Sequence, residues 1–182
     1  MKEVIIENPY LIQQIDGFTP IMSHLIIMMN YTRITTLQSV KGLSIEQLDY
    51  QFSETSNSIG ALLAHIAAVD KWYQVWTFEG REMTEEEMEP IKPAMMLGTL
   101  GREKIKENSL EYYLEELKST RAKTLEEFSK RDDEWLLKSL DDTPLFGAKE
   151  NNYFFWFHVL EDEINHRGQI RLIRKMQKVK KK

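Results

Sequence analysis

The chain of 182 residues has no cysteine. It therefore forms no disulfide, offers no thiolate to a metal ion and has no cysteine nucleophile. Any metal site has to be built from nitrogen and oxygen ligands, which excludes the cysteine-rich zinc-finger designs.

Long apolar runs and an excess of basic charge are also lacking. No stretch approaches the roughly 18 apolar residues that span a membrane, and no basic start leads into an apolar export segment. The formal net charge of -5 does not supply the basic face that nucleic-acid phosphates require. We therefore expect a cytoplasmic protein that binds neither nucleic acid nor a membrane.

What the chain does have is apolar patterning at helical spacing. Apolar residues make up 42% of the sequence, enough to build a core in a single domain over residues 1–182. No segment alternates convincingly with the two-residue period of a strand. Four segments carry helical stripes: 20–41, 58–80, 109–128 and 151–177. The pattern predicts an all-α fold, a four-helix bundle with a long crossover between helices two and three.

The crossover, residues 81–108, contains Pro90, Pro93, Gly98 and Gly101. These residues interrupt a helix, so we expect a long loop with short helical pieces. Bundle helices are usually joined by about two to eight residues, and longer insertions are often binding lids. A lid and a solvated connector are equally compatible with the sequence.

Two polar side chains interrupt the apolar stripes, His65 in the second helix and Arg121 in the third. A histidine among leucines and alanines must find a partner for at least one ring nitrogen. Taken alone, His65 is more often a satisfied core histidine than a ligand. We expect Arg121 to snorkel toward solvent rather than to bind a partner.

The fourth segment joins an aromatic run to closely spaced side chains that can bind a metal. Asp162 and His166 are four residues apart and lie roughly 40° apart around a helix, so they can share one target. His158 is a neighbour of Asp162 but lies roughly 12 Å along the axis from His166, so one ion is not expected to bind all three. His65 meets Asp162 and His166 if helices two and four pack side by side.

Two imidazoles and one carboxylate can bind zinc, nickel, iron or manganese and leave positions open for water or substrate. An aspartate and a histidine at this separation are also common as a plain hydrogen-bonded pair. The spacing alone leaves both interpretations open.

The run HVLEDEINHRGQ, from His158 to Gln169, resembles the C-terminal motif of the DinB/YfiT-like family of metal-dependent bundles, a histidine followed after three residues by His-Arg-Gly-Gln. The stretch SIGALLAHIA, which contains His65, resembles the second-helix motif of that family. The resemblance covers most of the chain and implies metal ligation by His65 and His166. Asp162 stands where the family usually has a histidine. A carboxylate binds the same ions, so we expect a site of two histidines and one aspartate, with zinc or nickel as the first candidates and iron or manganese as the others.

His158, Glu161 and Gln169 flank this face of the helix and are predicted to orient ligands or waters. Gly168 is expected to allow close packing in the helix. The sequence identifies no catalytic residue.

The resemblance implies an enzyme that joins a low-molecular-weight thiol, such as bacillithiol or mycothiol, to an electrophile, the metal lowering the thiol pKa. Metal-assisted hydrolysis is a second form of this hypothesis. The alternative is a non-catalytic, stress-linked bundle that binds a metal or a small molecule. Exposed apolar faces of such bundles often pair, so a homodimer belongs to either hypothesis. A third interpretation takes the cluster as buried polar structure only.

Overall fold

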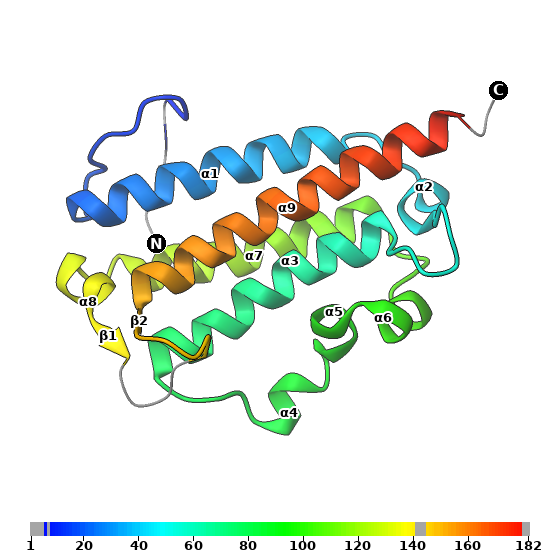
Figure 1. Ribbon diagram of the computed structural model, residues 1–182. Coiled ribbons are helices and arrows are strands. Elements are labelled where there is room, and N and C mark those ends of the chain that lie inside the picture. The colour runs from blue at the N-terminus through cyan, green and yellow to red at the C-terminus, as the bar shows by residue number, and fades with distance from the viewer. Residues whose placement is uncertain (1–5, 7, 141–144, 180–182) are drawn as a thin grey trace.

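The computed structural model describes residues 6, 8–140 and 145–179. Four long helices dominate it: α1 (Pro20–Val40), α3 (Ile59–Gln74), α7 (Leu110–Phe128) and α9 (Asn152–Val179). Helix α9 packs against both α1 and α3, and α3 packs against α7 (Figure 1). The prediction of an all-α four-helix bundle is confirmed. This arrangement makes α3 and α9 direct neighbours.

The helix starts follow from local side-chain chemistry. The Ser58 hydroxyl accepts a hydrogen bond from the Ala61 N–H, and the Ser109 hydroxyl accepts one from the Tyr112 N–H. These bonds satisfy N–H groups that have no partner within the first helical turn. Pro20 occupies the first turn of α1, where its missing N–H costs nothing.

The crossover contains the short helical pieces that its prolines and glycines predicted. These are α4 (Glu85–Met88), α5 (Lys92–Met96) and α6 (Gly98–Lys104). Helix α5 packs against α3, and the three pieces lie along one side of the bundle (Figure 1). Before the crossover, α3 continues into a π-helical turn, η1 (Val75–Glu79), and α2 (Ile45–Asp49) follows α1.

The linker between α7 and α9 holds more structure than its sequence suggested. Helix α8 (Asp133–Leu137) is followed by two short antiparallel strands, β1 (Ser139–Leu140) and β2 (Glu150–Asn151). Strands of two residues carry no readable alternation, so this pairing could not be found from periodicity.

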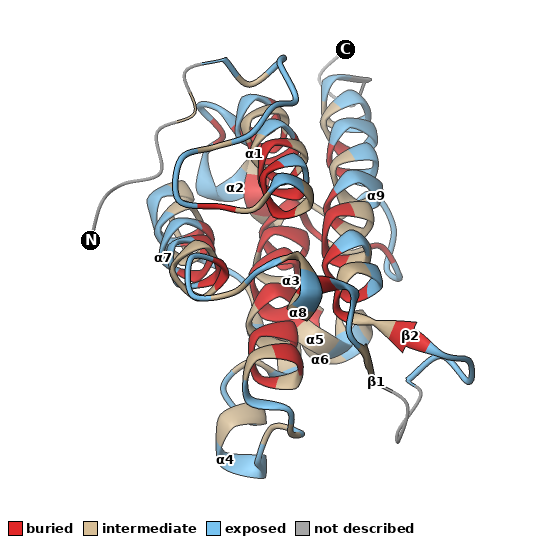
Figure 2. Cartoon of the chain, turned by 90° about the vertical axis from the view of Figure 1, so that its left-hand side faces the viewer, coloured by how far each residue is buried: buried red, intermediate tan, exposed pale blue. Residues whose placement is uncertain are grey.

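Buried residues lie on the faces that the four long helices turn toward one another (Figure 2). The largest fully buried side chains include Trp156, Phe155 and Phe128, which belong to one apolar cluster at the end of the bundle near α8. A second apolar cluster, around Leu62 and Tyr113, occupies the other end. The residues between these two clusters include polar groups from all four helices.

Four of these polar residues form an ionic network. Each comes from a different long helix: Arg33 (α1), Asp70 (α3), Arg121 (α7) and Glu163 (α9). Arg121 Nε lies 2.9 Å from Asp70 Oδ2, and its Nη2 lies 3.3 Å from Glu163 Oε2. Arg33 Nε lies 2.9 Å from Glu163 Oε1. The expectation that Arg121 snorkels to solvent is therefore wrong, because two carboxylates distant in sequence neutralise it inside the core.

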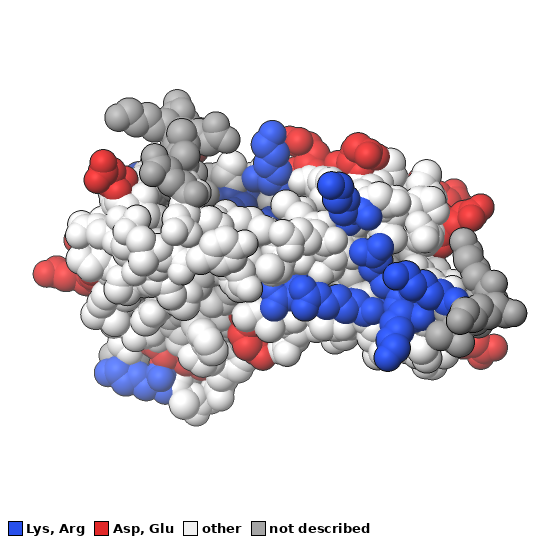
Figure 3. Space-filling view, turned by 90° about the horizontal axis from the view of Figure 1, so that it is seen from above, with Lys and Arg blue, Asp and Glu red and all other residues white. Residues whose placement is uncertain are grey.

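The C-terminal half of α9 is basic and braces α1. Arg171 Nε donates to the Ser39 hydroxyl over 3.0 Å, and Arg174 Nη1 donates to the Ser39 carbonyl over 2.7 Å. Arg167 donates to the Thr35 hydroxyl. Figure 3 shows lysine and arginine side chains gathered on this part of the surface. Among the described helices, none combines the length and hydrophobicity that a bilayer crossing demands.

Candidate metal centre

Helices α3 and α9 bring His65, Asp162 and His166 together. We call these three residues the His–Asp cluster. Asp162 Oδ1 lies 3.7 Å from His65 Nε2 and 3.2 Å from His166 Nε2. One ligand atom from each residue lies within 4.8 Å of the other two. The predicted meeting point between the second and fourth long helices therefore exists.

The cluster is largely withdrawn from solvent. The side chains of His65, Asp162 and His166 are 13%, 17% and 12% exposed. His65 Nδ1 lies 2.8 Å from the Ala94 carbonyl in α5. A carbonyl only accepts, so Nδ1 carries the proton and Nε2 presents its lone pair to the cluster. The crossover thus fixes the ring in the form that can bind a metal through Nε2.

Two atoms of the cluster lack hydrogen-bond partners among the described residues. They are Asp162 Oδ2 and His166 Nδ1, and both are buried. Buried polar atoms nearly always have a partner, so such an exception calls for an explanation. A carboxylate oxygen that ligates a metal ion would have such a partner, so the orphaned Asp162 Oδ2 fits a ligand role.

The donor set fits a divalent ion. Two ligands of a tetrahedral ion with bonds of about 2.0–2.1 Å lie about 3.4 Å apart. The separations of 3.2 and 3.7 Å from Asp162 Oδ1 bracket this value. Imidazole nitrogens and a carboxylate suit zinc, nickel, iron and manganese. The cluster could therefore hold a metal ion.

The contacts within the cluster shift the pKa values of Asp162 and His65. Burial acts to raise the pKa of Asp162, but hydrogen bonds and charge from His166 and His65 outweigh it and hold that pKa well below its usual value. Burial acts to lower the pKa of His65, but Asp162 and the Ala94 carbonyl outweigh it, so the net pKa is raised above 6.5. The carboxylate is therefore anionic at neutral pH, and a metal ion competes with a proton for His65.

The flanking residues take other partners. His158 Nδ1 lies 3.1 Å from the Tyr73 hydroxyl. Glu161 accepts a hydrogen bond from the Asn165 side-chain amide, and Gln169 is exposed. The predicted role of His158, Glu161 and Gln169 in orienting ligands stays a prediction. Tyr73 was not singled out from the sequence, because its contact with His158 joins two helices through residues that lie 85 positions apart.

Gly168 does not serve the close packing that was expected of it. A Cβ atom built at this position meets nothing within 4 Å in the described part of the chain. The glycine is exposed on α9, and because it lies two residues after His166 it is on roughly the opposite side of the helix from the His–Asp cluster. The expected close approach is therefore wrong within this chain.

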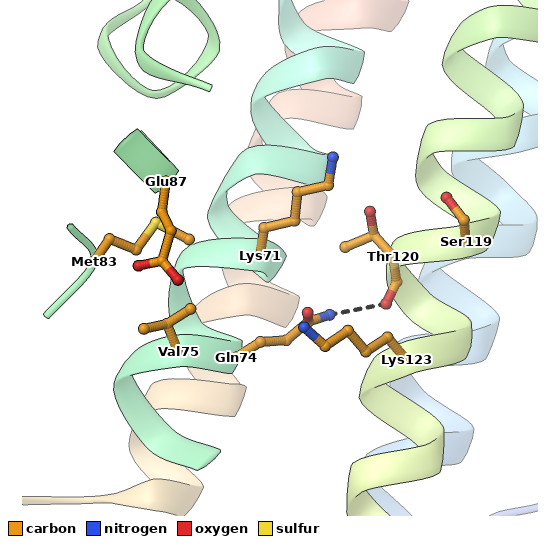
Figure 4. Close-up of a pocket in the computed structure, with 8 residues that line it drawn as sticks. All are labelled: Lys71, Gln74, Val75, Met83, Glu87, Ser119, Thr120 and Lys123. Atoms are coloured by element: carbon orange, nitrogen blue, oxygen red, sulfur yellow. Dashed lines mark hydrogen bonds between the residues drawn. The ribbon is translucent and has the colours of Figure 1, made fainter. Parts of the chain in front are cut away.

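Two cavities lie away from the cluster. One, of about 350 Å³, lies between α3 and α7 under the start of the crossover (Figure 4). Its Lys71 is paired with Glu116 at 2.6 Å, and its Gln74 donates to the Thr120 carbonyl at 2.9 Å. The other, of about 910 Å³, lies between the N-terminal segment, α1 and α7, and includes Arg33 and Arg121 of the ionic network. Gln74, Arg33 and Arg121, buried polar residues in their walls, already have partners, so neither cavity rivals the His–Asp cluster as a centre for chemistry.

Comparison with known proteins gives one family. The family model described as mycothiol-S-transferase matches residues 24–178, most of the chain and all three residues of the His–Asp cluster. No curated protein matches the chain significantly.

Proposed function

The chain belongs to the mycothiol-S-transferase family, a DinB/YfiT-like family, and on this premise we propose that it is a divalent-metal-dependent transferase that joins the sulfur of a low-molecular-weight thiol to an electrophile. The observation that carries the proposal is the His–Asp cluster, in which three ligand atoms from two helices lie within 4.8 Å of one another. The buried Asp162 Oδ2, which has no hydrogen-bond partner among the residues that the structure describes, supports a ligand role for this carboxylate.

The proposed ligands are His65, Asp162 and His166. These residues would hold a divalent ion, and the ion would supply the chemistry of lowering the pKa of a nearby thiol toward neutral pH. Zinc and nickel are the ions we propose first, and iron and manganese are compatible with the same ligands. With only three protein ligands, such an ion would be able to take the thiol as a further ligand.

The chain's own residues prepare this site before a ligand arrives. The Ala94 carbonyl selects the His65 tautomer, and Asp162 supplies a negative charge that stays ionised at neutral pH. The low exposure of the cluster limits competing water, which strengthens electrostatic interactions with a charged sulfur.

The proposed reaction is a substitution or an addition at carbon. The thiol proton leaves to solvent, and the sulfur forms a bond to the electrophilic carbon. In a substitution the leaving group departs with the electron pair of the broken bond. In an addition the broken π bond supplies the pair that takes up a proton from water.

The test combines elemental analysis with a thiol assay. Protein purified without added metal should contain a divalent ion, and His65→Ala and His166→Ala should each lose most of it. His24→Ala serves as the matched control, because His24 is an exposed histidine of α1 away from the cluster. The metal-loaded protein should accelerate the loss of free mycothiol in the presence of an electrophile, and both cluster variants should abolish this acceleration.

The outcomes separate the competing hypotheses. Equal metal content in the four proteins would contradict the ligand assignment. The unmodified protein could contain metal that both cluster variants lose and yet consume no thiol. That result would favour the non-catalytic metal-binding alternative.

A further inference from the structure

An exposed aromatic surface lies at the start of α9, on the face of the helix that also carries Asp162 and His166. It consists of Phe146, in the loop before β2, and of Phe154 and His158 in the first turns of α9, and we call these three residues the aromatic platform. The Phe146 ring lies 5.3 Å from the Phe154 ring and 5.2 Å from the His158 ring, between centroids. Phe146 is 49% exposed and Phe154 is 38% exposed. Phenylalanine is among the residues most often buried, so two neighbouring exposed rings suggest a binding surface.

The loop that carries Phe146 is held in place by a buried carboxylate. Glu150, in β2, is 6% exposed and accepts hydrogen bonds from the backbone N–H groups of Leu145 and Phe146. The Ser139 hydroxyl in β1 donates a hydrogen bond to the Glu150 carbonyl over 3.0 Å, so the backbone of Glu150 is also bound to β1. The Phe146 ring is therefore held by the fold against Phe154 at the start of α9.

His158 is the member of the aromatic platform that lies nearest to the His–Asp cluster along α9. His158 is four residues before Asp162, so the two side chains lie on one face of α9. Its ring accepts or donates one hydrogen bond with the Tyr73 hydroxyl at 3.1 Å. Tyr73 in turn follows His65 by eight residues on α3. The apolar surface and the cluster thus adjoin across the same pair of helices.

We propose that the aromatic platform binds the apolar, planar body of the electrophile and leaves its reactive carbon directed toward the His–Asp cluster. This inference rests on the proposed function and names its acceptor class, an uncharged electrophile with an aromatic group. A planar ring can stack on or pack edge-to-face against Phe146 and Phe154. Leu145 and Phe157, 42% and 50% exposed, extend the apolar surface around it.

The test uses two electrophiles with one reactive group, N-phenylmaleimide and N-methylmaleimide. In both, the mycothiol sulfur loses its proton to water and bonds to one alkene carbon, while the other carbon takes a proton from water. After subtraction of the uncatalysed rate, kcat/KM should be higher for N-phenylmaleimide. Phe146→Ala and Phe154→Ala should each lower that value by about tenfold and leave the N-methylmaleimide value within about twofold, because only the phenyl group meets the platform.

Phe52→Ala is the matched control, because Phe52 is a 40% exposed phenylalanine in the loop before α3. It should change neither value. The platform variants should also keep the metal content of the unmodified protein, since they leave the His–Asp cluster intact. Equal losses for both maleimides, or no loss for either, overturn the inference.

A second measurement separates this inference from the proposed function. N-phenylsuccinimide has the same shape but no reactive double bond, so its binding is measured by titration without turnover. If the protein consumes thiol with neither maleimide, the proposed function fails. The titration with N-phenylsuccinimide still shows whether the aromatic platform binds an aromatic ligand. Weaker binding to Phe146→Ala than to Phe52→Ala supports the platform, and equal binding overturns it. A change of oligomeric state in Phe146→Ala with unchanged binding would show a self-association surface instead.

Discussion

Two polar clusters lie side by side in the bundle, and adjacent residues of α9 belong to different ones. Glu163 belongs to the ionic network, where two carboxylates face two guanidinium groups. Asp162 belongs to the His–Asp cluster, where a carboxylate oxygen and an imidazole nitrogen lack partners among the described residues.

The difference separates a structural cluster from a binding cluster. In the ionic network the charges balance, and burial, which acts to raise the pKa of Glu163, is outweighed by Arg33 and Arg121, so that its pKa is lowered. Such a network needs no further partner and fixes the rotation of α9 within the bundle. The His–Asp cluster has unused ligand capacity in the same core, which is the property expected of a site that takes up an ion.

The largest effect on stability is expected at Glu163. Glu163→Ala leaves Arg33 and Arg121 buried with too little negative charge, and breaking a buried pair in this way costs about 3–5 kcal/mol. Urea unfolding of the metal-free protein measures this loss. The matched change at Asp162, Asp162→Ala, should cost less than this, because it removes contacts with two histidines and leaves no buried guanidinium without its carboxylate. Equal losses at the two positions would remove the distinction between the clusters.

Metal binding should show the reverse order. Asp162→Asn removes the charged ligand and should weaken metal binding by more than about a hundredfold, since even residues that only support ligands contribute 10–100-fold. Glu163→Gln keeps the shape of its side chain and touches no proposed ligand, so the folded fraction should retain its metal affinity. Competition with a chelator of known affinity measures both values, and a weaker effect at Asp162 than at Glu163 speaks against the ligand assignment.

The pH dependence should differ between the metal-free and the loaded protein. The pKa of His65 is raised in the fold, so its contribution to stability is present below pH 6.5 and is lost as pH rises through the raised value. Metal binding requires the neutral imidazole and therefore strengthens over the same interval. The increase in Tm on adding metal should be larger at pH 8 than at pH 6. Asp162 does not change charge in this window, because its pKa is lowered. A metal-induced shift that is the same at both pH values would argue against histidine ligation.

The smallest effect is expected when one ligand replaces another. Asp162→His places the residue that the wider family usually has at this position, and imidazole suits the same ions. The variant should keep its metal, with an affinity within about tenfold of the unmodified protein. Elemental analysis and chelator competition check this, and complete loss of metal would show that the cluster requires a carboxylate.

How much the sequence could predict depended on the distance between interacting residues. Ser58, Ser109 and Pro20 marked helix starts because their bonds are local. Asp162 and His166 were predictable as a pair because they are one turn apart, and His65 joined them through the fold class. Arg121 was misread because its partners lie 51 and 42 residues away, where no periodic pattern connects them.

Large sequence separation also explains why the aromatic residues near the His–Asp cluster could not be predicted. Tyr73 and His158 are separated by 85 residues, and Phe146 reaches His158 through a strand pair too short to show alternation. Ring contacts of this kind depend on how α3, α9 and the loop dock against one another. They become visible only with the tertiary structure.

The hydrogen bond between His65 and the Ala94 carbonyl gives the crossover an influence on reactivity. If α5 moved away from α3, the imidazole would lose the contact that selects its tautomer, and Nδ1 and Nε2 would compete for the proton. A change in the crossover, far from any ligand in sequence, would then alter how strongly the ion is held. The crossover residues are therefore a place where natural variation could adjust metal affinity without altering a single ligand.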